Sequence, residues 1–72
     1  MDRISRTIDP KHLKRASKVE TANLGPYMES VLTSMQIALD QWRYHGDDGA
    51  DLQLALGAFL ALITEAERRG LV

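Results

Sequence analysis

Residues 52–66, LQLALGAFLALITEA, decide the fold of this 72-residue chain. The apolar residues of this stretch recur at steps of four and three, the spacing that keeps side chains on one face of an α-helix. They are Leu52, Leu56, Phe59, Ile63 and Ala66. An apolar face of this width must be covered by other parts of a folded protein. The stretch therefore predicts a buried helix against which the rest of the protein packs.

A second helix with a matching apolar face is predicted over residues 26–44. Its apolar positions also recur at steps of four and three: Leu24, Met28, Val31, Met35, Ala38 and Trp42. Gly25 and Pro26 predict the break before this helix, because glycine permits left-handed backbone angles and proline restricts the residue that precedes it. The two long helices are joined by a short polar connection, so we expect an antiparallel hairpin.

A shorter helix is predicted before the hairpin, over about residues 10–23. Asp9 suits its start because aspartate accepts hydrogen bonds from free backbone N–H groups, and Pro10 suits the first helical position because it has no N–H to lose. Residues 1–8 show no useful periodicity and are expected to form a flexible tail. Residues 9–72 are expected to form a single helical domain.

The ends of the third helix, over about residues 49–69, are predicted from capping residues. Asp47 or Asp48 is expected to cap its start. Gly70 is expected to end it in the left-handed conformation, with Leu71 folding back onto the last turn.

The size of the chain favours an all-α domain that self-associates. A chain of 72 residues without cysteine has neither disulfides nor thiolate metal sites to reinforce a small core. An isolated hairpin also covers only part of its two apolar faces. We therefore expect a homodimer whose hairpins form a four-helix-type bundle. This architecture resembles small dimeric bundle proteins, among them plasmid copy-control RNA-binding bundles, but architecture alone implies no function.

The charges are unevenly distributed along the chain. Residues 1–18 carry six basic and two acidic residues, whereas the remainder carries three basic and eight acidic residues. If the first helix forms, four basic residues share one side of it: Lys11, Lys14, Arg15 and Lys18. This basic stripe predicts a solvated face, docking on the acidic body of the protein, or contact with an acidic protein or a nucleic acid. Nucleic acid is less expected, because no aromatic residue is interleaved with the charges.

Two further sets of residues are candidate contact surfaces. Ile37 and Tyr44 lie among polar neighbours on the second helix, so they are isolated surface residues, or they are covered by another helix, or they bind a partner protein. Leu54, Ala58 and Ala61 lie on the side of the third helix opposite its apolar face. They are expected either beside the N-terminal segment or in a subunit contact.

No motif in the chain points to catalysis, and no metal or cofactor is expected. The chain has no nucleophile elbow, Walker-type phosphate loop, GxGxxG or HExxH motif, so we expect it not to be an enzyme. No glutamate stands three places before His12 or His45, as the Glu-x-x-His pair of a ferritin-like metal site would require. The run of aspartates around Asp48 lacks the late glutamate of a calcium loop and is better explained by helix capping.

Location and function are predicted only in broad terms. No segment reaches the ~20 apolar residues of a membrane span, and the N-terminus lacks the apolar core of a signal peptide. A cytoplasmic protein without membrane contact is expected. The leading hypothesis is a homodimeric protein-interaction or regulatory protein. The alternatives are a nucleic-acid-binding regulator that uses the basic stripe, and an accessory subunit of a larger enzyme.

Overall fold

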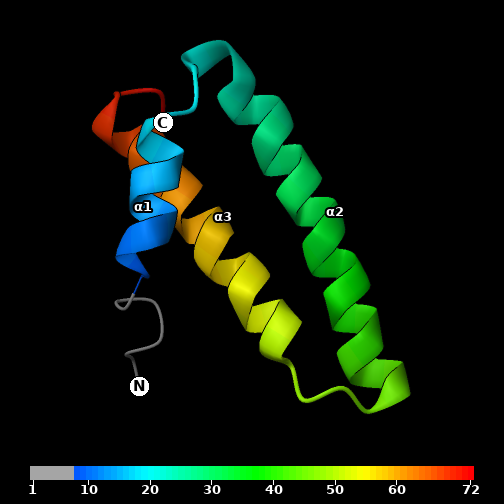
Figure 1. Cartoon of the computed structure of the whole chain (residues 1–72). Helices are drawn as coiled ribbons and strands as arrows, with labels where there is room; N and C mark the ends of the chain where they lie inside the picture. The colour runs from blue at the N-terminus through cyan, green and yellow to red at the C-terminus, as the bar shows by residue number, and fades with distance from the viewer. Residues whose placement is uncertain (1–7) are drawn as a thin grey trace.

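The computed structural model describes residues 8–72, and this part of the chain forms three α-helices and no strand (Figure 1). The helices are α1 (Pro10–Ser17), α2 (Thr21–His45) and α3 (Ala50–Arg68). The predicted all-α fold is confirmed. None of these helices is both long enough and apolar enough to cross a membrane. The predicted tail lies outside the described residues except for Ile8, which packs against the core.

Helix α1 starts as predicted but ends early. Asp9 is its N-cap, with Pro10 as the first helical residue, and the Asp9 carboxylate accepts a hydrogen bond of 2.9 Å from the backbone N–H of Lys11. The helix ends at Ser17, so the predicted extension to about residue 23 is wrong. The start of α1 is predictable from the sequence because it depends only on adjacent residues.

Helix α2 starts at Thr21 and contains Gly25 and Pro26, so the break predicted at this pair is wrong. Proline disfavours a helical conformation of the residue before it partly because its Cδ clashes with that residue's Cβ, and glycine has no Cβ. Proline also leaves the carbonyl of Ala22 without a helical N–H partner. The helix gains the burial of Leu24 in exchange, and this packing outweighs the local cost.

The connection from α2 to α3 is short and polar, as predicted. Gly46 closes α2 in the left-handed conformation at φ 72°, and Gly49, at φ 86°, occupies the N-cap position of α3. The predicted aspartate N-cap is therefore wrong in position. Asp48 still serves the start of α3, because its carboxylate accepts a hydrogen bond of 3.0 Å from the backbone N–H of Ala50.

Helix α3 ends in the predicted manner. Gly70 adopts the left-handed conformation at φ 75°. The backbone N–H of Leu71 donates to the carbonyl of Ala66 at 2.9 Å, which is the folded-back arrangement that satisfies the last carbonyls of a helix.

Helix α3 lies between the other two helices (Figure 1). Helix α2 runs antiparallel to α3, as predicted, while α1 packs on a different side of α3 and scarcely touches α2. The core cluster lies where the three helices meet: Ala16, Leu24, Ala61 and Leu62. No large side chain of residues 8–72 is fully buried. The core is therefore small and lies beside the C-terminal half of α3.

The predicted apolar face of α2 is buried unevenly. Leu24 and Ala38 are buried, and Met28 is partly buried against the core. Trp42, predicted on the same face, is 50% exposed. Its indole lies beside the connection to α3, where a Cβ added to Gly49 would be 3.4 Å from the indole Cδ1. The tryptophan therefore covers the connection and not the core.

Candidate functional site

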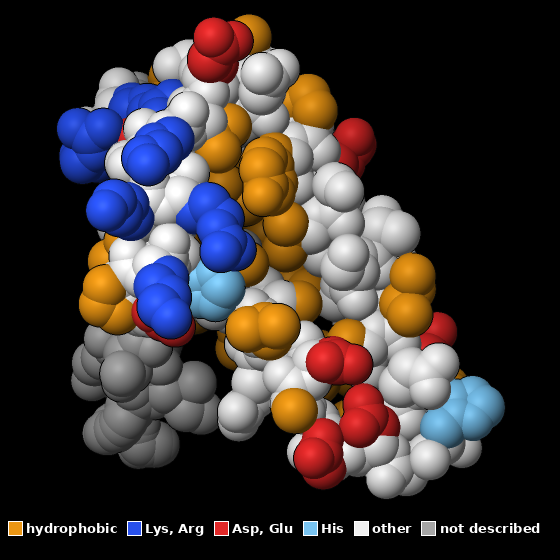
Figure 2. Space-filling view, in the orientation of Figure 1, with side chains coloured by type: hydrophobic (Ala, Val, Ile, Leu, Met, Phe, Trp, Pro, Cys, Tyr) orange, Lys and Arg blue, Asp and Glu red, His pale blue; other side chains and the backbone are white. Residues whose placement is uncertain are grey.

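An apolar groove of about 490 Å³ runs between α1 and α2, with α3 as its floor. Figure 2 shows the apolar side chains gathered between the two outer helices. The lining residues are His12, Arg15, Ala16 and Val19 on the α1 side, Tyr27, Val31, Ser34, Ile37, Ala38 and Gln41 on α2, and Asp51, Leu54, Ala55, Ala58 and Leu62 on α3. The groove exists because α1 and α2 both pack on α3 but not on each other.

The length of the groove and the spacing of the residues that line it match those of an α-helix. On α2 its wall runs from Tyr27 to Gln41, a distance of about 21 Å at the rise of an α-helix. The lining residues of α2 and α3 recur mainly at steps of three and four, so the groove follows the helix axes and does not cross them. Its shape therefore suits the apolar face of a further helix.

The groove brings together candidate residues that the sequence assigned to separate surfaces. Ile37 of α2 is 58% exposed, and Leu54 of α3 is 61% exposed. Both line the groove, and Ala58 lies in its floor, partly buried. Two large apolar side chains thus remain in water beside an apolar groove, and a docked helix would cover them.

The other predicted contact residues lie elsewhere. Tyr44 is exposed near the end of α2, with the guanidinium of Arg43 at 4.9 Å from its ring centroid. Ala61 is fully buried in the core. The ring of His12 lies against α3 at Gly57. The small residues of this face therefore receive α1, which is one of the two alternatives expected from the sequence.

The charged residues lie toward opposite ends of the groove. The basic stripe is exposed on α1 and at its C-cap, Lys18, and Arg15 lines the groove itself. Helix α1 lies along α3 from Gly57, which the ring of His12 contacts, to Arg69, which donates to the carbonyl of Ser17. Asp51 lines the groove in the first turn of α3, shortly after Asp47 and Asp48 of the connection. Figure 2 shows the basic side chains over α1 and the acidic side chains near the connection. The groove therefore has a basic end and an acidic end.

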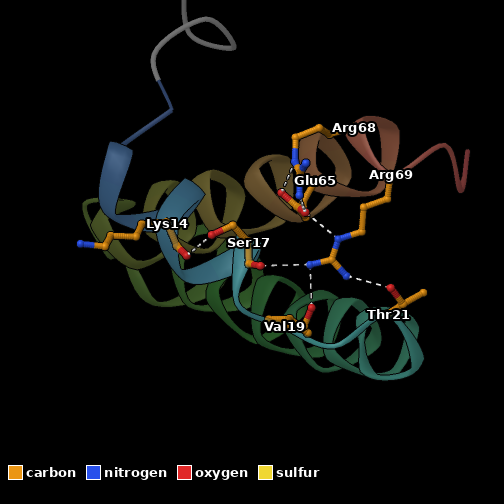
Figure 3. Close-up of polar contacts among 7 residues, drawn as sticks. All are labelled: Lys14, Ser17, Val19, Thr21, Glu65, Arg68 and Arg69. Atoms are coloured by element: carbon orange, nitrogen blue, oxygen red, sulfur yellow. Dashed lines mark hydrogen bonds and ion pairs between the residues drawn. The ribbon is translucent and has the colours of Figure 1, made fainter.

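The end of α3 fixes the α1 side of the groove through Arg69 (Figure 3). Its guanidinium donates hydrogen bonds to the carbonyl of Val19 at 2.7 Å, the carbonyl of Ser17 at 3.2 Å and the hydroxyl of Thr21 at 3.1 Å. We call this set of contacts the Arg69 clamp. Because Val19 also lines the groove, the clamp holds one end of the groove wall in place.

Glu65 orients the clamp. Its buried carboxylate accepts hydrogen bonds from Arg68, at 3.0 Å for Nε, and from Nε of Arg69. The bonds from Arg68 and then from Arg69 lower the pKa of Glu65 from its usual 4.5 to about 2, and the same pairing raises the pKa of Arg68. This network was not predicted from the sequence. Its signal was an acidic residue on an apolar helix face, three and four positions before two arginines.

Comparison with protein-family models, curated proteins and solved structures found no match to this chain. Within residues 8–72, no group of three or more acidic or histidine side chains is placed to hold a metal ion. The candidate site is therefore defined by its own geometry: an apolar groove at helical spacing, with a basic end, an acidic end and a clamped wall.

Proposed function

We propose that this chain is a non-catalytic protein-interaction protein whose groove binds the apolar face of a partner helix. The observation that carries the proposal is the joint exposure of Ile37 and Leu54 on one groove lined at helical spacing. Docking a helix there removes apolar surface from water, which is the main driving force of most protein association. Helix-in-groove recognition uses anchor residues at the same spacing of three and four.

Site-specific photo-crosslinking in the native host tests the groove. A photoreactive residue replaces Ser34, which lines the groove, or Asp40, which is exposed on α2 outside it. We expect a defined protein adduct from position 34 and not from position 40. The adduct should disappear when Leu54→Asp is added, because a carboxylate in an apolar contact is costly. Equal labelling from both positions, or an adduct unaffected by Leu54→Asp, would refute the proposal.

A second candidate function, nucleic-acid binding, is supported by the exposure of the whole basic stripe on α1. Binding through these cations would weaken steeply with salt, because counterions are released from the phosphates. Fluorescence anisotropy with a labelled DNA or RNA duplex measures this dependence. Lys14→Ala combined with Arg15→Ala should reduce both the affinity and the salt dependence. Binding that is insensitive to salt and to this double variant would exclude the stripe as a nucleic-acid interface.

A further inference from the structure

The charges at the groove are arranged so that the groove complements itself. Arg15 lies on α1 between His12, which contacts α3 at Gly57, and Ser17, whose carbonyl accepts a hydrogen bond from Arg69. Asp51 lies in the first turn of α3. Turning a second copy end over end places the basic end of one groove opposite the acidic end of the other. The basic end of each groove then meets the acidic end of the other, because a two-fold contact uses the same patch on both subunits. A partner of one charge would match only one end.

The apolar residues of the groove are also placed so that two copies would match across a two-fold axis. Ser34 lies midway along the α2 wall between Tyr27 and Gln41. If two α2 helices pack antiparallel across this midpoint, Ile37 of each copy faces the region of Val31 in the other. The exposed Ile37 of one copy then enters the groove of its partner. Leu54, in the floor, is covered by the same contact.

The thin core supplies a reason for a second copy to be the occupant. The fully and nearly buried apolar residues of the described chain are four alanines and two leucines. Oligomerisation is one of the ways in which chains of this size add to the stability of a small core. The chain has no cysteine. A copy of the same chain is present wherever the protein is made, and it carries the matching charges.

We propose that the partner is a second copy of this chain, docked groove to groove with antiparallel α2 helices about a two-fold axis near Ser34. This proposal rests on the proposed function of the groove and names its occupant. Arg15 of each copy faces Asp51 of the other, and Ile37 of each copy fills the groove of the other. Of the subunit contact expected from the sequence, Leu54 and Ala58 lie in this groove, whereas Ala61 is buried in the core.

Sedimentation equilibrium of the full chain at micromolar concentration is the first test. We expect a mass near twice the 8.1 kDa of one chain. Leu54→Asp should raise the dimer dissociation constant at least about 100-fold. Leu32→Asp is the matched control, because Leu32 is also exposed but lines the opposite side of the hairpin. A dimer that survives Leu54→Asp and is lost with Leu32→Asp would overturn the proposal.

A charge exchange tests the antiparallel arrangement. Arg15→Glu or Asp51→Arg alone should weaken the dimer by about tenfold or more, since like charges then face each other. The double variant should restore the dissociation constant to near that of the wild type. Additive loss in the double variant would overturn the predicted pairing. Far-UV circular dichroism confirms that each exposed-site variant remains helical.

A single cysteine supplies a test that does not depend on destabilising the dimer. Ser34→Cys should form a disulfide-linked dimer on mild oxidation, because the two copies meet at the axis and disulfides require Cα atoms within about 7 Å. Asp40→Cys should not. Equal linkage at both positions would overturn the proposal. If the chain sediments as a single copy while Ser34 crosslinks a different protein in a Leu54-dependent manner, this inference fails and the proposed function stands.

Discussion

Replacing Arg69 with alanine removes the three hydrogen bonds that tie the end of α3 to residues 17–21 and also the bond from its Nε to Glu65. At about 1 kcal/mol net per hydrogen bond, the free energy of unfolding should fall by about 2–3 kcal/mol. A domain of this length has a total stability of about 4–10 kcal/mol, so the loss is a large share of it. In this variant the carboxylate of Glu65 still has a hydrogen-bond partner, because Arg68 continues to donate to it.

Urea unfolding followed by far-UV circular dichroism measures this loss. With a slope of about 1 kcal/mol per molar urea for a chain this small, the midpoint should fall by about 2–3 M. The protein concentration must be held constant, because self-association adds to apparent stability.

Arg68→Ala is the matched control. Arg68 bonds to the same carboxylate, but its side chain is 66% exposed and contributes nothing to the clamp. Its replacement should change the midpoint much less than that of Arg69. Arg69→Lys should lose most of the effect of the clamp while keeping the charge, because an ammonium group cannot reproduce the fork of a guanidinium. Equal midpoints for the two alanine variants would refute the role of the clamp.

Three further predictions concern single residues. The pKa of Glu65 is lowered from 4.5 to about 2 in the folded chain, so its contribution to stability is complete above pH 4.5 and is lost as the pH falls toward 2. Glu65→Gln should remove this pH-dependent contribution. A difference in the free energy of unfolding between the wild type and Glu65→Gln that stays constant across that pH range would contradict the prediction. Gly25→Ala should lower the thermal midpoint, because the added Cβ would clash with Cδ of Pro26, although no atom beyond its chain neighbours and the nearby helix backbone lies within 4 Å of it; a raised midpoint would show that the helix preference of alanine outweighs this clash. Gly57→Ala should be tolerated, with the new Cβ 3.4 Å from His12, whereas Gly57→Leu should cost about 1–3 kcal/mol by overpacking against α1; equal thermal midpoints would contradict the contact.

Features that depend on adjacent residues were predictable from the sequence. The start of α1 at Asp9 and Pro10 and the end of α3 at Gly70 follow from hydrogen bonds within a few residues. The antiparallel pairing of α2 with α3 follows from two matching apolar faces and a short polar connection. In each case the local pattern and the packing favour the same structure.

The errors arose where packing opposed the local pattern. Gly25 and Pro26 are breakers by themselves, but Leu24 gains burial when α2 continues through them. The sequence contains the residues of the Arg69 clamp, but not the fact that α1 ends beside α3. The groove could not be predicted from the sequence for the same reason. Ile37 and Leu54 lie on α2 and α3, and the groove that they line is completed by residues of α1, whose position the sequence does not show.

The central position of α3 has a consequence for the order of folding. Helices α1 and α2 are both synthesised before α3, yet each finds its main packing partner in α3. The clamp joins residues that are 50 and 52 positions apart in the chain. A nascent chain that has produced only α1 and α2 therefore has no core to form and exposes apolar surface, a condition that favours aggregation and chaperone binding. The core is therefore expected to form late and in one step, when the segment that carries Arg69 is available to bond to residues 17–21.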